Sequence, residues 1–80
     1  MYKVYILQSL KDKGFYVGHT EDLAVRLERH NNGKVRSTKS GCPWKIVYQE
    51  SYNTRAEAFK RELQIKSYKG GEAFKKLINH

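Results

Sequence analysis

The order of apolar and polar positions near the start of the chain predicts a central β-strand. Residues 2–9 carry β-branched and aromatic side chains on both alternations, with Val4 and Ile6 on one side and Tyr5 and Leu7 on the other. A strand that is apolar on both faces is typical of one covered by other elements on both sides.

A second strand is expected to return beside the first. Residues 11–14 are polar and end in Gly14, which can adopt a positive φ in a hairpin turn. Residues 15–19 are again aromatic and β-branched, so they are expected to pair with the first strand as a hairpin.

A helix is predicted after this hairpin. Thr20 is its expected N-cap, and the acidic residues that follow suit the positive end of the helix. Leu23, Leu27 and His30 recur on one helical face, and the Asn-Asn-Gly sequence at 31–33 is a strong stop.

The second half of the chain predicts a strand and two helices. After a loop over residues 34–43, residues 44–52 alternate as a third strand. Thr54 and Glu57 have the spacing of a capping box, which opens a helix that runs to about Lys69.

The core face of this helix is expected to carry Ala56, Phe59 and Leu63. The glycine pair at 70–71 breaks the helix, and residues 72–79 are expected to form a short final one.

These elements, in the order ββαβαα, predict one α/β (α+β) domain over residues 1–80. A three-stranded, antiparallel-type mixed sheet in the order 2-1-3 places the doubly apolar first strand at the centre, flanked by helices. A right-handed crossover from the second strand to the third fits this order.

The composition narrows the class of partner. Sixteen Lys and Arg against eight Asp and Glu give a net charge of +8, which attracts polyanions and favours nucleic acid. No basic amphipathic stretch favours a membrane, and we expect no membrane span and no signal peptide. The single cysteine, Cys42, excludes an internal disulfide and fits a cytoplasmic protein.

Two phenols, a guanidinium and a carboxylate form a candidate catalytic set: Tyr5, Tyr16, Arg26 and Glu62. Phosphodiester hydrolysis needs an activated water and stabilisation of the charge that develops on phosphate. Each residue also has a structural reading, since strand tyrosines bury their rings, an arginine can lie on the surface and Glu62 can pair with Lys66 one turn later.

The spacing of these residues resembles that of the GIY-YIG nuclease superfamily. Val4-Tyr5-Ile6 stands at the first signature and Tyr16-Val17-Gly18 at the second, ten residues separate the two tyrosines and nine separate Tyr16 from Arg26. The first signature lacks its usual glycine and isoleucine. The features shared with small standalone bacterial members are Gly18-His19-Thr20, Arg26-x-x-x-His30-Asn31-x-Gly33 and Gly41-x-Pro43-Trp44. These members are similar to the catalytic domain of a eukaryotic structure-specific endonuclease subunit.

The resemblance implies the roles of the site residues. Glu62 would bind a divalent metal, Mg²⁺ or alternatively Mn²⁺, and Arg26 would contact the phosphate. Tyr5 would take part in water activation and Tyr16 would orient the phosphate, although the sequence does not decide which tyrosine is the base. His30 is either a substrate contact or a residue that caps its helix.

The basic residues near this set are expected to bind nucleic acid. They are His19, Lys34, Arg36, Lys39, Lys66 and Lys69. Trp44 could stack on a base, but a core position is the more conservative reading.

The first hypothesis is therefore a metal-dependent endonuclease that cleaves DNA, with a structure-specific role of the kind found in repair. A non-catalytic nucleic-acid-binding module is the alternative, and a subunit that depends on a protein partner for targeting is a third. The second and third hypotheses arise because larger relatives add a separate binding domain.

Overall fold

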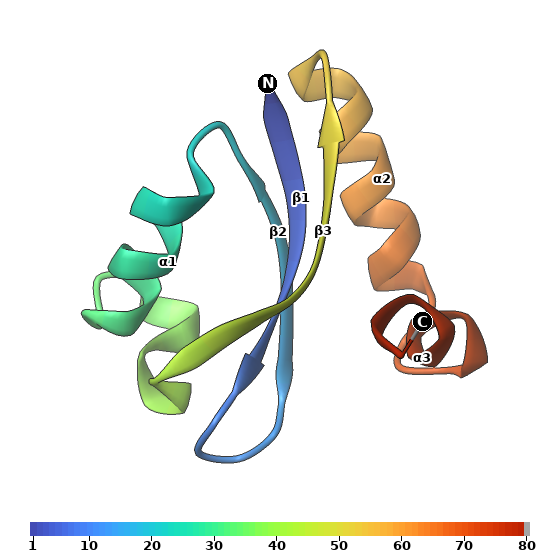
Figure 1. Cartoon of the computed structure of the whole chain (residues 1–80). Helices are drawn as coiled ribbons and strands as arrows, with labels where there is room; N and C mark the ends of the chain where they lie inside the picture. The colour runs from blue at the N-terminus through green and yellow to red at the C-terminus, as the bar shows by residue number, and fades with distance from the viewer. Residues whose placement is uncertain (80) are drawn as a thin grey trace.

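A twisted three-stranded sheet separates helices on its two faces (Figure 1). The computed structural model describes residues 1–79. Helix α1 and the 3₁₀ helix η1 lie on one face, and α2 and α3 lie on the other. The elements are β1 (Tyr2–Ser9), β2 (Phe15–Thr20), α1 (Leu23–Asn31), η1 (Arg36–Gly41), β3 (Trp44–Tyr52), α2 (Arg55–Ser67) and α3 (Glu72–Ile78).

The sheet has the order β2-β1-β3, as the sequence predicted. Strand β1 pairs antiparallel with both neighbours, and Tyr5 lies opposite Gly18 of β2 and Gln49 of β3. The register between β1 and β3 shifts at Ile6 and Leu7. The fold is therefore α+β, with antiparallel pairing on each side of the central strand.

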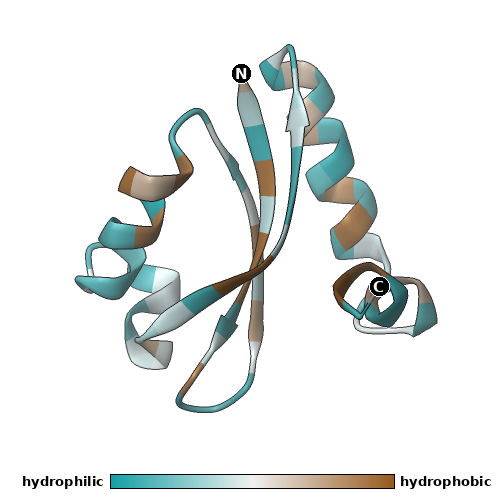
Figure 2. Cartoon of the chain, viewed as in Figure 1, coloured by the Kyte–Doolittle hydropathy of each residue, from teal (hydrophilic) through white to brown (hydrophobic). Residues whose placement is uncertain are grey.

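Strand β1 is buried on both faces, which confirms the prediction from its double apolar pattern. Val4 and Ile6 lie in a core beneath α2 and α3, while Tyr5 and Leu7 lie in a second core beneath α1. Trp44 belongs to the second core, and its indole donates to the Thr38 carbonyl at 2.9 Å. In Figure 2 the apolar residues accordingly follow the middle of the sheet.

Two local predictions about β2 were wrong. Helix α1 is capped by Asp22, whose Oδ1 accepts from the Val25 amide at 3.2 Å, because Thr20 is still paired with Lys3 as the last residue of β2. In the hairpin turn Lys13, rather than Gly14, has the positive φ of 67°.

The predicted start of α2 is correct, but its predicted core face is wrong. Thr54 caps the helix and accepts from the Glu57 amide at 3.2 Å. The buried positions are Ala58, Glu62 and Ile65, whereas Ala56 is exposed, and Phe59 and Leu63 are 48% and 50% exposed.

The reason for this error is the small size of Ala58, which places the helix close to the sheet. Ala58 and Ile65 lie two turns apart and therefore on one stripe, which joins the core beneath α2. Residues 34–43 also hold more structure than the predicted loop, since they include η1.

A partly buried carboxylate, that of Glu50, joins the outer strand β3 to α2. Arg61 holds Glu50 of β3 with Nη2 to Oε2 at 3.0 Å and Nε to Oε1 at 3.0 Å, and the hydroxyls of Tyr48 and Tyr52 donate to the same carboxylate. Burial alone would raise the pKa of Glu50, but these hydrogen bonds outweigh burial and hold the pKa below its ordinary value.

This network makes stability depend on pH. A carboxyl group with a lowered folded-state pKa stabilises the fold above its unfolded pKa of about 4.3, and the contribution is lost as the pH falls through the folded-state pKa. We predict that Glu50→Gln lowers the thermal unfolding midpoint at pH 7 and makes the midpoint fall less between about pH 5 and pH 3. Circular dichroism melts test this, with exposed Glu28→Gln as the matched control. Equal pH dependence in wild type and Glu50→Gln would contradict the assignment.

Candidate active site

A polar pocket of about 390 Å³ brings together the predicted tyrosines, arginine and glutamate. Side chains from β1, β2, α1 and α2 line it. Its lining residues are Tyr2, Tyr5, Tyr16, Gly18, His19, Thr20, Glu21, Arg26, Arg55 and Glu62. Four predicted catalytic residues from four different elements thus share one cavity.

Tyr5 forms the floor of this pocket. It is 1% exposed and lies across β2 at Gly18, where an added Cβ would come within 2.7 Å of the Tyr5 hydroxyl and 2.9 Å of Cζ. Glycine at position 18 is therefore required for the Tyr5 ring to take this place. The structure thus identifies Tyr5 as the group that closely approaches Gly18.

The Tyr5 hydroxyl is held by a buried chain of hydrogen bonds. Tyr5 Oη lies 3.2 Å from His30 Nε2, and His30 Nδ1 lies 2.7 Å from Thr38 Oγ1. The Thr38 hydroxyl donates to the Val35 carbonyl at 3.3 Å, so it accepts from Nδ1–H, which leaves Nε2 to accept from Tyr5. Burial, with Arg26 and Arg29 nearby, lowers the pKa of His30, which agrees with this neutral tautomer.

This arrangement gives His30 a different place from either one expected for it. His30 is fully buried beneath Tyr5 and does not line the pocket. Its ring supports Tyr5 from below, through the hydrogen bond to the Tyr5 hydroxyl. Tyr16, by contrast, is partly exposed and lies against both rings, at centroid distances of 6.3 Å from Tyr5 and 4.9 Å from His30.

Glu62 reaches the pocket from α2. It is 7% exposed, and its two oxygens have different partners: Oε1 lies 2.5 Å from His19 Nδ1, and Oε2 accepts from Lys66 Nζ at 2.6 Å. Glu62 therefore forms the pair with Lys66 that its structural reading predicted, and it also lines the pocket.

Arginine side chains enter the pocket from two helices. Arg26 comes from α1, and no carboxylate among residues 1–79 forms an ion pair with its guanidinium. Arg55, which the sequence analysis missed, stands at the first position of α2. The sequence could have identified Arg55, because Arg55 and Glu62 are seven residues apart and therefore lie on one face of the helix.

The other basic residues fall into two groups. His19 and Lys66 contact Glu62, and Lys69, in the turn after α2, lines a second cavity together with Lys66. Lys34, Arg36 and Lys39 are exposed near the end of α1 and in η1, and none of them lines the pocket. The burial of Trp44 confirms the core reading for that residue and not the base-stacking one.

The donor set fits a divalent cation held by one protein carboxylate. Within the described part of the chain, no three His, Cys, Asp or Glu side chains come together as a metal cluster. Mg²⁺ often takes only one or two carboxylates and keeps several waters, so buried Glu62 is the candidate ligand for such an ion.

The close contact between Gly18 and Tyr5 predicts the effect of a single methyl group. Gly18→Ala should destabilise the fold by about 1–3 kcal/mol, the usual range for overpacking, because a buried ring must move. Gly14→Ala is the matched control, since its nearest neighbour is the exposed Asp12 side chain, and it should change stability much less. Urea unfolding measures both variants, and equal effects would contradict the packing assigned to Tyr5.

Comparisons with known proteins identify the family of this chain. The family model of the GIY-YIG catalytic domain matches residues 1–75. A UPF0213 protein of Staphylococcus epidermidis is 46% identical over 66 residues, which cover 81% of this chain and 79% of the relative. A UPF0213 protein of Staphylococcus aureus is 44% identical over the same shares of the two chains.

The solution NMR structure of a UPF0213 protein from Bacillus halodurans is 30% identical, with a TM-score of 0.48, and covers 91% of this chain and 90% of that one. In residues 1–79 of the present chain, no helix has the length and apolar character needed to cross a membrane. The resemblance drawn from the sequence is confirmed, and the chain belongs to the GIY-YIG family, alongside the UPF0213 proteins.

Proposed function

We propose that this chain is a divalent-metal-dependent endonuclease that hydrolyses phosphodiester bonds in DNA. The observation that supports this most is the joint presence of Tyr5, Tyr16, Arg26 and Glu62 in one polar pocket. The family provides the class of chemistry, since the matching model describes a catalytic domain of the GIY-YIG type. The net charge of +8 favours a polyanionic substrate.

Arg26 is proposed to contact the phosphate. A planar guanidinium can donate to two non-bridging oxygens at once, and these oxygens gain charge as the transition state forms. Arg26 has no ion pair within residues 1–79, so a phosphate would not have to displace a protein carboxylate. Arg55, at the other side of the same pocket, would add positive charge.

The two tyrosines are proposed to have different roles because their environments differ. Burial, reinforced by neighbouring Tyr16, raises the pKa of Tyr5, so Tyr5 remains a neutral phenol whose proton is directed to His30. Its oxygen lone pairs are then the part of Tyr5 that can accept a hydrogen bond. Tyr16 is the more exposed phenol and is proposed to contact the attacking water.

Glu62 is the residue that would hold a divalent metal. When bound there, the metal would supply Lewis-acid stabilisation of charge on the phosphate oxygens. Lys66 and His19, which now contact the carboxylate, keep Glu62 directed into the pocket. The basic residues Lys34, Arg36 and Lys39 are proposed to contact the DNA backbone away from the point of cleavage.

A second candidate function is a nucleic-acid-binding module without catalysis. One observation favours it: both Glu62 oxygens already have partners in the protein, as they would in a purely structural ion pair. With either function, a protein partner could direct the chain to its nucleic-acid substrate. Cleavage assays on single-stranded, duplex, nicked and branched DNA, with and without Mg²⁺ or Mn²⁺, decide between these functions.

Removal of the Glu62 charge tests the proposed metal site. Glu62→Gln should reduce metal-dependent cleavage by at least about 10²-fold, because a catalytic metal supplies several kcal/mol of charge stabilisation. DNA affinity should stay the same or rise, since a negative charge is lost beside the phosphate. Single-turnover rates and binding isotherms measure the two effects, with Glu28→Gln on the exposed face of α1 as the control. Cleavage by Glu62→Gln at the wild-type rate would reject the site.

Replacement of Arg26 by lysine separates geometry from charge. Arg26→Lys should keep DNA affinity within a few fold but slow cleavage by about 10²–10³-fold, the usual cost of losing one oriented donor. Exposed Arg29→Lys, on the same helix, should leave both quantities unchanged. If the two variants cleave equally fast under single-turnover conditions, Arg26 is a surface cation and not a catalytic residue.

A further inference from the structure

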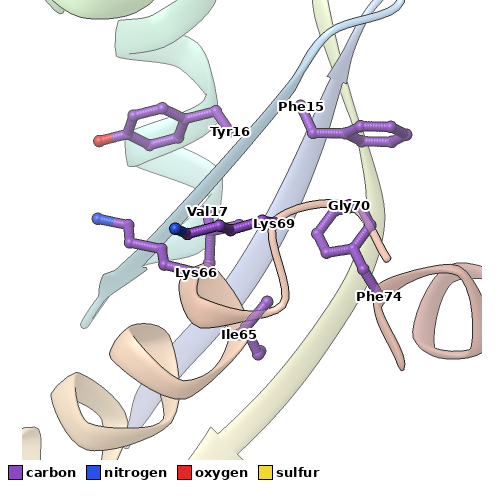
Figure 3. A pocket seen from close by; sticks show the side chains of 8 residues that line it. All are labelled: Phe15, Tyr16, Val17, Ile65, Lys66, Lys69, Gly70 and Phe74. Carbon is purple, nitrogen blue, oxygen red and sulfur yellow. The ribbon is translucent and has the colours of Figure 1, made fainter. Parts of the chain in front are cut away.

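A second cavity lies beside the C-terminal end of α2 and shares one lining residue, Tyr16, with the candidate active site. It has a volume of about 320 Å³, near the lower end of the range for small-ligand sites. Its lining residues are Phe15, Tyr16, Val17, Ile65, Lys66, Lys69, Gly70 and Phe74 (Figure 3). We call this cavity the aromatic groove.

One end of the aromatic groove is formed by two phenylalanines. Phe15 of β2 and Phe74 of α3 meet edge to face, with ring centroids 5.0 Å apart. Phe74 is a core residue, but Phe15 is 43% exposed. Because β2 is an outer strand of the sheet, the exposed part of the Phe15 ring is open to a planar ligand.

The other end carries positive charge. Figure 3 shows the Lys66 and Lys69 side chains extended in the same direction, on the side of the groove toward the Tyr16 ring. No carboxylate lines the groove itself. A ligand that fits must therefore combine an apolar ring with negative charge.

The backbone at Lys69 provides an independent observation. Lys69 has a φ of 50°, in the left-handed region where glycine and asparagine are favoured, and Gly70 follows with a φ of 77°. A lysine here has an unfavourable backbone conformation, and its side chain lines the groove. Sites of this kind often have a functional reason for the residue they hold.

Two residues link the lining of the groove to the candidate active site. Tyr16 lines both cavities, and Lys66 lines the groove while donating to Glu62. A ligand in the groove would thus lie next to the group that contacts Glu62.

We propose that the aromatic groove binds one unstacked nucleobase of a single-stranded segment, placed beside the phosphate to be cleaved. The base would stack against Phe15, and the neighbouring backbone phosphates would contact Lys66 and Lys69. Bases inside a duplex are stacked on each other and cannot enter, so the groove selects unpaired nucleotides. This inference rests on the proposed function for its choice of nucleic acid as ligand.

Binding measured without metal tests the groove separately from catalysis. Fluorescence anisotropy in EDTA compares a short oligothymidylate with an oligomer of the same length that has abasic sites throughout. Both carry the same backbone charge, so their difference in affinity reports the bases alone. The wild-type chain should bind the oligothymidylate more tightly.

Phe15→Ala should weaken oligothymidylate binding by about 5- to 150-fold, the effect of losing one base–aromatic stack, and leave abasic binding unchanged. Phe15→Tyr should restore the wild-type preference, because it keeps the ring. Phe15 is half exposed, so each variant is expected to fold, and thermal melts verify this.

Lys69→Asn should weaken binding to both oligomers equally, while its unfolding midpoint stays the same or rises because asparagine suits the left-handed backbone. Lys45→Asn removes the same charge from β3, the strand at the opposite edge of the sheet, and should have a much smaller effect.

The outcomes separate the two proposals. Equal affinity of the wild type for both oligomers, or no effect of Phe15→Ala on binding, would overturn the proposal that the groove binds a nucleobase. The groove would then serve packing or a protein partner, and the proposed cleavage activity would be unaffected. Failure to bind either oligomer or duplex DNA would instead reject nucleic acid as the substrate, and with it the proposed function.

Discussion

The hydrogen-bond chain from Tyr5 through His30 to Thr38 determines how the rest of the site is built. Tyr5 lies between Val4 and Ile6 in the central strand and is only 1% exposed, so its buried hydroxyl would be costly without a partner. His30 provides that partner, and Thr38 fixes the orientation of the imidazole. One chain of contacts thereby joins β1, the end of α1 and η1, and holds Tyr5 at the floor of the pocket.

Ion pairs position two of the carboxylates in this small, basic domain. The net charge is +8, yet two carboxylates each hold a cationic partner: partly buried Glu50 holds Arg61, and buried Glu62 holds Lys66. Glu50 joins β3 to α2 and so places the helix. The same helix carries Glu62 to the pocket, where Arg26 approaches from α1 on the other face of the sheet. The stability of the Glu50 network and the geometry of the pocket are therefore linked through α2.

Much of this fold followed from local sequence patterns. The double apolar alternation of residues 2–9 predicted the central strand, and the spacing of Thr54 and Glu57 predicted the cap of α2. The core face of α2 could not be predicted in the same way, because Phe59 and Leu63 look more apolar than Ala58 and Glu62. Close packing of a small alanine against the sheet decided the rotation of the helix, and this is a tertiary effect.

The candidate site was predictable only as far as its motifs were. The family spacing identified Tyr5, Tyr16, Arg26 and Glu62, but it gave no sign that His30 lies beneath Tyr5 or that Arg55 enters the pocket. The burial of His30 depends on η1, a segment with no apolar periodicity. The aromatic groove depends on Phe15 and Phe74, which are 59 residues apart and meet only in the folded chain.

The most direct test of the central claim is to locate a bound divalent cation in the presence of DNA. Paramagnetic broadening of amide signals by Mn²⁺, with a phosphorothioate oligonucleotide that resists cleavage, would map its position. The account predicts selective broadening around residues 16–20, Arg26 and residues 62–66, which disappears in Glu62→Gln. Broadening that persists in that variant, or that centres on the carboxylates Glu50, Glu57 or Glu72, would contradict the account.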